Sequence, residues 1–273
     1  MSSFGSRWHL FEFMDLPWLP ASLRQVLRDI LECGNGRPFR GYYDWAVHCI
    51  VCQAALAQAE RVVELGAGTA PLTRRLAADP RATGLKLVIC DLSPDLALYD
   101  ALARQYPGKV EVLREPVDFS QPRDWPPGTL LVLSATLHHV PAAQRVAVLK
   151  ALARSGRAVL VLEPLRRTLL SAWFVWLSLA PALLAPLVQW QRPGRWRRLV
   201  WCWLVPVAPL LFVWDGLVSC WRQWTAGEWH EAIASLPAGH ACAGQVSETL
   251  FCQKVVLTCR RVGADDQFGF RTP

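Results

Sequence analysis

The stretch Val62-Val63-Glu64-Leu65-Gly66-Ala67-Gly68-Thr69-Ala70 decides the fold of this 273-residue chain. Its apolar beginning predicts a short strand over Arg61–Leu65, and a helix is expected from about Pro71 to Ala78. The glycines between them allow positive φ angles and let a ligand approach the backbone. The N-terminus of the following helix presents free N–H groups. The stretch therefore predicts a strand, a ligand-binding turn and a helix in succession.

The same alternation continues along the chain. Further strands are expected over Lys86–Cys90, Val110–Leu113, Leu130–Ser134 and Ala158–Leu162. Helices are expected over Ala21–Glu32, Tyr42–Ala59, Pro94–Tyr106 (capped by Ser93) and Ala142–Arg154. Short apolar strands that alternate with helices of about twelve residues indicate an α/β fold with a doubly wound, mostly parallel sheet.

Composition excludes several classes of protein. Hydrophobic residues make up 52% of the chain, which excludes overall disorder, while charged residues are scarce at 19%. The nine Cys are an odd number without framework spacing, so a disulfide-rich secreted module is not expected. No basic region followed by an apolar run stands at the N-terminus, so we expect no signal peptide and a cytoplasmic protein. Cys49-x-x-Cys52 has no second pair and no matching His, so no metal site is expected.

The turn can be compared with two nucleotide-binding patterns. The dinucleotide fingerprint G-x-G-x-x-G needs a third glycine, and Pro71 stands there. The stretch instead resembles the first motif of the class I (Rossmann-like) S-adenosylmethionine-dependent methyltransferases, apolar-apolar-acid-x-G-x-G, in which Glu64, Gly66 and Gly68 occupy the defining positions. The resemblance covers residues 60–165, and 216–260 more loosely.

The resemblance implies roles for residues at the strand ends. Asp91, followed by Leu92, closes the second strand, where the family places an acid on the ribose hydroxyls; Asp118-Phe119 follows the third, where it places an acid and an apolar residue on the adenine. Ser134-Ala135-Thr136-Leu137-His138-His139-Val140 resembles the L-H-H stretch after the fourth strand. The implied S-adenosyl-L-methionine site comprises Glu64, Gly66, Ala67, Gly68, Asp91, Leu92, Asp118, Phe119 and Ser134.

The two histidines could supply a base. A phenol or carboxylate acceptor needs little help, whereas an aliphatic hydroxyl or an acidic carbon needs a general base, for which His has a suitable pKa. His139 is the first candidate and His138 the second; the alternative is that both only pack and form hydrogen bonds. Glu163, at the end of the fifth strand, faces either the acceptor or a structural partner.

The fold class that follows is a Rossmann-like methyltransferase fold with an apolar helical insertion after the fifth strand. We expect an N-terminal helical region (1–60), a cofactor-binding core (61–165), the Trp- and Arg-rich insertion (166–215), a C-terminal helix with closing strands (216–262) and a loose tail (263–273). Thr225 is expected to cap a helix to Leu236, and Ser247–Arg260 to form one or two strands.

The insertion is the least typical part of the sequence. Residues 168–191 carry no charge, and as one helix they would extend about 36 Å, enough to cross a bilayer core. Pro181 and Pro186 interrupt this run, and a second uncharged run of 16 residues, Leu199–Trp214, is too short to cross. Two spans would export the Arg192–Arg198 turn, against the positive-inside tendency. A broken, Trp-rich hairpin in the headgroup region fits better; two spans, a lid over the site and a dimer interface are the alternatives.

The location of the charge favours a membrane surface over nucleic acid. Residues 154–198 contain eight Arg and one acid, so the net charge of this stretch equals the net charge of +7 of the whole chain. This basic stretch borders the most apolar part of the sequence, and ten of the 14 Trp lie between Trp173 and Trp229. We therefore expect no nucleic-acid partner, and an enzyme on the cytosolic face of a membrane, with homo-oligomerisation left open.

The leading hypothesis is methyl transfer to a hydrophobic small-molecule or lipid-like acceptor. An NAD(P)-dependent oxidoreductase is the alternative from the same fold, and a non-catalytic membrane-associated protein is the alternative from another class. The acceptor, its reacting atom and the pathway do not follow from the sequence.

Overall fold

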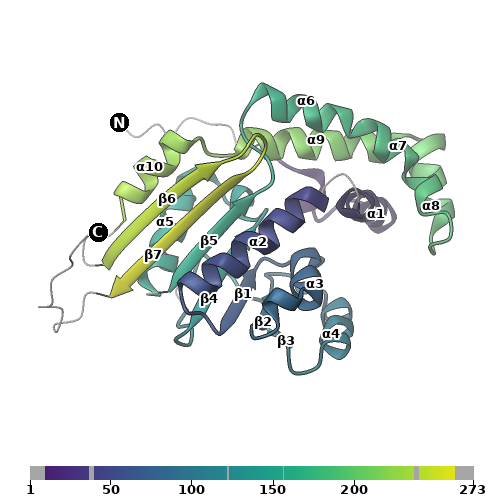
Figure 1. Ribbon diagram of the computed structural model, residues 1–273. Helices are drawn as coiled ribbons and strands as arrows, with labels where there is room; N and C mark the ends of the chain where they lie inside the picture. The colour runs from purple at the N-terminus through teal and green to yellow at the C-terminus, as the bar shows by residue number, and fades with distance from the viewer. Residues whose placement is uncertain (1–9, 37–39, 122, 156, 237–239, 262–273) are drawn as a thin grey trace, which may run out of the picture.

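The computed structural model describes residues 10–36, 40–121, 123–155, 157–236 and 240–261 (Figure 1). One seven-stranded sheet has the order β3-β2-β1-β4-β5-β7-β6. The strands are β1 (Arg61–Leu65), β2 (Lys86–Cys90), β3 (Val110–Val112), β4 (Thr129–Ser134), β5 (Ala158–Glu163), β6 (His240–Glu248) and β7 (Gln253–Arg261). The first five pair in parallel, and β7 is antiparallel to both β5 and β6. The expected α/β class with a mostly parallel sheet is confirmed.

Helices cover both faces of the sheet because successive side chains of each strand point to opposite faces. Along β4, Leu130 and Val132 pack on the face covered by α2 (Arg40–Leu56), α3 (Pro71–Ala78) and α4 (Leu96–Gln105). Leu131 and Leu133 pack on the face covered by α5 (Ala142–Arg154) and α10 (Ala226–Ala234). The described residues between β3 and β4 form a loop without a helix.

Several expected elements need small corrections. The cap of α4 is Asp95, whose Oδ1 accepts from the N–H of Leu98 at 3.1 Å, and not Ser93. The closing pair of strands begins at His240, and not at Ser247. Thr225 does cap α10, in a capping box with Glu228. The expected loose tail, 263–273, lies outside the described residues.

The apolar insertion is a layer of broken helices, as expected, packed against the N-terminal helix α1 (Ala21–Gly36) (Figure 1). Its elements are α6 (Leu169–Leu177), α7 (Leu179–Val188), α8 (Arg195–Leu199), a π-helical turn (Val200–Leu204) and α9 (Val207–Arg222). Helix α6 packs along α9, while α1 packs on α7 and α9. The first break falls at Ser178, because Pro181 lies in the first turn of α7, where its missing N–H needs no partner.

Length and composition would let part of this layer cross a membrane. Residues Leu169–Val188 have a mean hydropathy of 1.7, and the bent pair Arg195–Leu204 and Val207–Arg222 would be a second span only if its 79° bend were accommodated. Both statements concern the described residues. Core helices of soluble proteins can have the same length and composition, so packing must decide how the layer is used.

Candidate functional site

The parallel register brings the ends of five strands to one edge of the sheet. At this edge lie the glycine turn after β1, Asp91 after β2, the histidine stretch after β4 and Glu163 at the end of β5. In open α/β sheets, ligands bind at this carboxyl edge. The fold therefore gathers most of the residues that the sequence singles out.

The turn after β1 is held open by its two glycines. Gly66 has φ +71°, and a Cβ placed there would lie 2.5 Å from Cγ2 of Thr136. Gly68 has φ +55°, and a Cβ there would meet no described atom within 4 Å. The N–H groups of Gly66 and Ala67 donate to the carbonyl of Cys90 at 3.1 and 3.0 Å. Gly66 is thus required for close packing, while Gly68 faces the open space above the turn.

Asp91 fixes the turn from the neighbouring strand. Its Oδ2 accepts from the N–H of Gly68 at 2.9 Å, and its Oδ1 accepts from the N–H of Ser93 at 2.9 Å. The hydroxyl of Tyr99 donates to the carbonyl of Gly68 at 2.9 Å. Each carboxylate oxygen has a second lone pair, so Asp91 can hold the turn and still accept from a diol.

Glu64 lies beneath the turn and is almost completely buried. Its Oε2 accepts from the N–H of Thr73 in α3 at 3.1 Å and from the Thr73 hydroxyl. Burial raises the pKa of Glu64 to about 7, against the opposite effect of the Thr73 hydrogen bonds. Glu64 therefore ties β1 to α3 and supports the turn from below.

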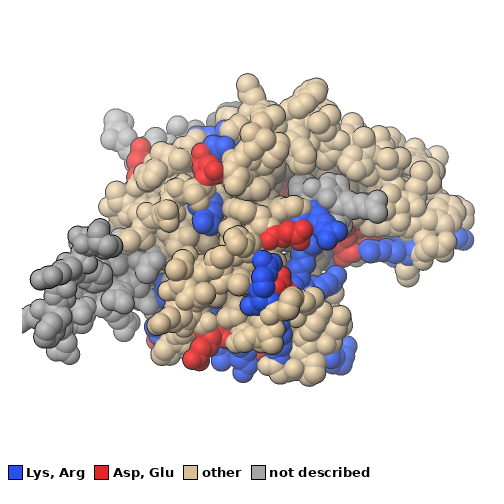
Figure 2. Space-filling model, viewed as in Figure 1, with Lys and Arg blue, Asp and Glu red and all other residues tan. Residues whose placement is uncertain are grey.

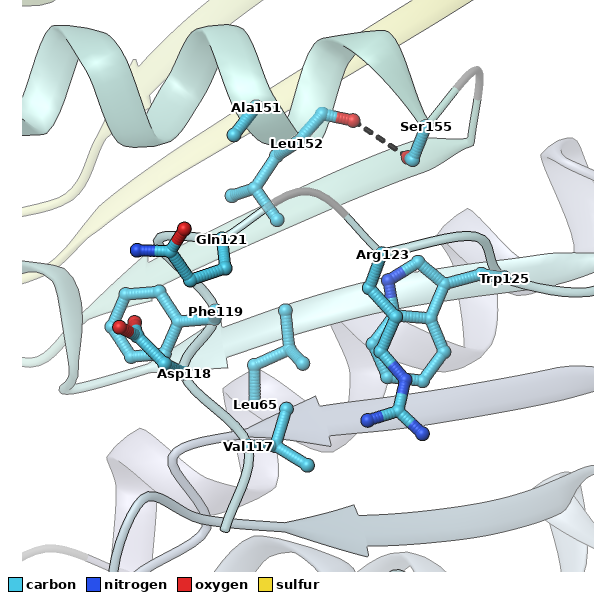
Figure 3. Close-up of a pocket in the computed structure, with 10 residues that line it drawn as sticks. All are labelled: Leu65, Val117, Asp118, Phe119, Gln121, Arg123, Trp125, Ala151, Leu152 and Ser155. Carbon is cyan, nitrogen blue, oxygen red and sulfur yellow. Dashed lines mark hydrogen bonds between the residues drawn. The ribbon is translucent and has the colours of Figure 1, made fainter.

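Asp118 and Phe119 line a small cavity that is open to solvent (Figure 3). Leu65, which directly precedes Gly66, lines the same cavity. The cavity continues along α5 to Ser155, which precedes β5 and so lies toward the opposite edge of the sheet. Most of the residues that line the cavity belong to the loop between β3 and β4, which covers this part of the sheet in place of a helix. Leu92, also a candidate from the sequence, is exposed beside Asp91.

Ser134, at the end of β4, is engaged by the helical N-terminal region. Its Oγ lies 2.8 Å from the hydroxyl of Tyr42, which also donates to the carbonyl of Leu162 at 3.2 Å. The next turn is held by Thr136, whose hydroxyl donates to the carbonyls of Ser134 at 2.8 Å and Gly66 at 3.3 Å. Sequence reasoning quoted Thr136 within the histidine stretch but gave it no role, and it missed Tyr42 because no motif marks that residue.

His138 is buried and oriented by Glu163. The distance from His138 Nδ1 to Glu163 Oε2 is 2.8 Å, and Gln223 Nε2 donates to the same oxygen at 3.0 Å. Burial alone would raise the pKa of Glu163, but His138, Gln223 and Arg145 hold it below its ordinary value. A carboxylate acceptor on Nδ1 selects the tautomer whose Nε2 carries the lone pair. Glu163 thus acts on His138, the structural role that the sequence had left open.

His139 makes a separate set of contacts with an N-terminal segment, Leu10–Leu16, which we call the strap. Its Nδ1 lies 3.2 Å from Asp15 Oδ2 and 3.8 Å from Glu12 Oε2. Burial would lower the pKa of His139, but Asp15 and Glu12 raise it above its ordinary value. The two histidine rings pack with centroids 4.4 Å apart. His139 therefore lies against the carboxylates of the strap, whereas His138 is paired with Glu163.

Two arginines that the sequence did not single out fasten this region. Arg145 of α5 donates to the carbonyls of His138, Val140 and Arg222 at 2.8, 2.7 and 2.6 Å. Arg222, at the end of α9, donates to Glu12 Oε1 at 3.0 Å. Only the tertiary structure brings these residues, far apart in sequence, to the histidine stretch.

A second candidate surface lies on the helical layer. Of the 22 large hydrophobic side chains that are exposed in the described part of the chain, 17 lie between Leu169 and Trp221. Figure 2 shows a region over α6, α7 and α9 almost free of charged side chains. Trp173 and Trp176 of α6 are exposed there by 62% and 51%. We call this region the apolar face.

The basic residues around the apolar face are fewer than the sequence indicated. Arg198 is buried, where it donates to Asp29 Oδ2 at 2.8 Å and to the carbonyls of Gln189, Arg192 and Pro193. Arg166 and Arg167 pair with Glu248 and Glu228. The exposed basic residues at the α8 end are Arg192, Arg195 and Arg197, and Arg195 lies over the rings of Trp190 and Trp196 at 5.5 Å from each centroid.

Comparison with known proteins supports the fold through structure alone. No protein-family model and no curated protein matches the sequence. An O-methyltransferase from neocarzinostatin biosynthesis, solved with S-adenosylmethionine and 2-hydroxy-5-methyl naphthoic acid, is similar with a TM-score of 0.52 and 18% identity, over 88% of this chain and 58% of that one. Its complex with S-adenosyl-L-homocysteine and 1,4-dihydroxy-2-naphthoic acid gives 0.53 and 18%, over 87% and 58%.

A SAM-dependent methyltransferase from Aquifex aeolicus gives a TM-score of 0.50 and 11% identity, over 85% of this chain and 97% of that one. The chain spans 58% of the length of the neocarzinostatin enzyme. At these identities the likeness concerns the fold.

Proposed function

We propose that this chain, which has the class I methyltransferase fold, is an S-adenosylmethionine-dependent methyltransferase for a hydrophobic small-molecule acceptor and works at a membrane surface. The observation that carries the proposal is the turn at Gly66–Gly68, fixed by Asp91 and placed beside a buried His138–Glu163 pair. The neighbouring structures, solved with this cofactor or its product, agree with the choice of cofactor.

The residues of the turn fit the cofactor. Gly68 leaves open space on the side where a ligand would approach the backbone, and Asp91 retains lone pairs for the two ribose hydroxyls. Asp118, exposed beside Phe119, is placed to accept from an exocyclic amine. When bound, the cofactor supplies an electrophilic methyl group, so the chain's own task is to position the acceptor and exclude water.

The structure favours His138 over His139 as the base, in reverse of the order expected from the sequence. The Glu163 carboxylate accepts from Nδ1 of His138 and so leaves Nε2 free to take the proton of an acceptor hydroxyl. His139 instead faces two carboxylates that favour its protonated form, in which it cannot accept a proton.

Cofactor binding and transfer are tested separately. We expect S-adenosylmethionine to bind in a calorimetric titration, and isotopic methyl label to enter a lipid extract. His138→Ala should lower kcat by about 10²–10⁴-fold with little change in cofactor affinity, while His139→Gln should retain most of kcat. NAD binding without S-adenosylmethionine binding would overturn the proposal, and equal losses of kcat in both variants would overturn the choice of base.

The membrane part of the proposal rests on the one-sided packing of the helical layer. Helix α1, which carries Arg28, Asp29 and Glu32, packs on α7 and α9, so lipid cannot surround these helices without burying charge. The opposite side is the apolar face, with Trp and Arg at the α8 end. Trp beside Arg is typical of segments that lie in the headgroup region. The layer therefore suits a monotopic dock on an anionic surface better than two spans.

Vesicle flotation tests the dock. Wild-type protein should float with vesicles that contain phosphatidylglycerol. The combined variant Trp173→Ser/Trp176→Ser should lose most of this binding, while Leu56→Ser, which changes an even more exposed residue on α2, should not. Wild-type protein that stays unbound without detergent would contradict the dock.

A further inference from the structure

The strap places its two carboxylates among basic side chains. Glu12 is the only buried side chain among residues 10–16. Its Oε1 accepts from Arg222 Nη1 and from the Ser219 hydroxyl, each at 3.0 Å. Asp15 Oδ2 lies 3.2 Å from His139 Nδ1 and 3.6 Å from Arg222 Nη1. The strap thus inserts two carboxylates into a group of donors, Ser219, Arg222 and His139, which we call the carboxylate seat.

The seat belongs to rigid parts of the fold. Ser219 and Arg222 are one turn apart on α9, and His139 follows β4 in a short 3-10 turn. Arg145 holds both parts together through the carbonyls of His138 and Arg222. The donors are therefore held in place by contacts that do not involve the strap.

The strap is anchored both by polar contacts and by Phe13 and Met14, which pack in part against the core of α1, α7 and α9. Asp215 accepts from the N–H groups of Phe13 at 2.7 Å and Met14 at 3.1 Å, and Arg222 Nε donates to the carbonyl of Leu10 at 2.9 Å. None of the hydrophobic side chains of the strap is fully buried. An external carboxylate can replace those of Glu12 and Asp15 in kind, because it offers the same charge and acceptor atoms to Arg222 and His139.

The strap also brings two apolar rings to α9. The rings of Phe11 and Phe13 lie 6.2 and 6.4 Å from that of Trp214, which is exposed on α9. A ligand that replaces the strap, with its acid in the seat, would have its apolar part beside Trp214, where the strap now has Phe11 and Phe13.

We propose that the strap is an internal competitor for an acidic amphiphile, a molecule with an apolar body and a carboxylate head, which binds in the seat of Ser219, Arg222 and His139. The head would lie next to His138, whose ring packs on that of His139. Identifying this amphiphile as the methyl acceptor rests on the proposed function; its binding does not.

Binding of dodecanoate to the full chain, below its micelle-forming concentration, tests the proposal, with dodecanol as the neutral match. We expect dodecanoate to bind at least ten-fold more tightly than dodecanol. Glu12→Gln/Asp15→Asn should tighten dodecanoate binding about ten-fold, because the strap no longer competes. Glu32→Gln removes a surface acid of α1 that pairs with Arg192, far from the seat in the sequence and in a different ion pair. It should leave the affinity for dodecanoate unchanged.

Two further measurements distinguish binding in the seat from nonspecific hydrophobic binding. Ser219→Ala and His139→Gln should each weaken dodecanoate but not dodecanol, in protein whose circular dichroism is unchanged. Dodecanoate should also speed amide hydrogen exchange at Phe13 and Met14, whose N–H groups bond to Asp215.

Equal affinity for acid and alcohol, no change in the strap variant, or unaltered exchange would each overturn the seat. Failure of S-adenosylmethionine to bind, with these results intact, would overturn the proposed function and leave the seat standing.

Discussion

Replacing Gly66 by Ala tests the geometry on which the proposed cofactor site depends. The new Cβ would lie 2.5 Å from Cγ2 of Thr136, and the residue would keep φ +71°. A left-handed backbone costs a non-glycine residue about 1–2 kcal/mol, and overpacking costs about 1–3 kcal/mol. We expect Gly66→Ala to lower the free energy of unfolding by about 2–5 kcal/mol in total.

Two matched variants divide this loss into its parts. In Gly68→Ala the residue would keep φ +55°, but its new Cβ would meet no described atom within 4 Å. The free energy of unfolding should therefore fall only by the backbone cost of about 1–2 kcal/mol. Thr136→Ser removes the crowded methyl and keeps the hydroxyl that bonds to Ser134 and Gly66. In the double variant Gly66→Ala/Thr136→Ser, the overpacking part should be recovered.

Urea unfolding followed by circular dichroism gives the four free energies of this double-mutant cycle. We expect a coupling of about 1–3 kcal/mol in favour of the double variant. A coupling below about 0.5 kcal/mol would refute the contact. Gly68→Ala should in addition weaken S-adenosylmethionine binding despite its smaller effect on stability, because its methyl projects into the open space above the turn.

Other perturbations follow from the buried polar groups. Asp91→Asn should weaken S-adenosylmethionine binding by about 1.5–3 kcal/mol in a calorimetric titration. Asp91→Ala should weaken it by more, because Ala also leaves the N–H of Gly68 without its acceptor. Equal losses would contradict the double role of Asp91 in binding the ribose and holding the turn. Folding raises the pKa of Glu64 from 4.5 to about 7, so its contribution to stability is full below pH 4.5 and is lost as the pH rises through 7. Glu64→Gln should therefore remove a fall of up to about 3 kcal/mol in unfolding free energy between pH 4.5 and 8, and an unchanged pH profile would count against a buried carboxyl. Arg198→Gln should destabilise the helical layer by about 3–5 kcal/mol in thermal unfolding, because it removes the buried cation that donates to Asp29 Oδ2 and to the carbonyls of Gln189, Arg192 and Pro193. The exposed set Arg192, Arg195 and Arg197, changed together to Gln, should leave stability within about 1 kcal/mol of wild type and weaken flotation with anionic vesicles; the reverse pattern would contradict the assignment.

The helical layer shows which properties of a segment its sequence can and cannot reveal. Its lack of charge and its prolines predicted broken apolar helices, and the structure has them. The eight Arg of residues 154–198 suggested one basic surface, because sequence gives formal charge but not partners. Folding buries Arg198 and pairs Arg166 with Glu248, so only a few of these charges face solvent at the α8 end.

By itself the sequence determined the parallel α/β core and the turn after β1. Both depend on local patterns: alternating apolar strands and helices, and glycines at Gly66 and Gly68 where positive φ is needed. Local patterning also placed Asp91 and the histidine stretch at the carboxyl edge, because parallel strands end there together.

Only the tertiary structure decided what those side chains do. Glu64 accepts from Thr73 inside the fold, His138 pairs with Glu163, which also accepts from Gln223, and His139 contacts the strap near the N-terminus. These contacts join residues 9 to 124 positions apart and leave no periodic signal in the sequence. The environment of each histidine depends on such partners, and for this reason we propose His138, and not His139, as the base.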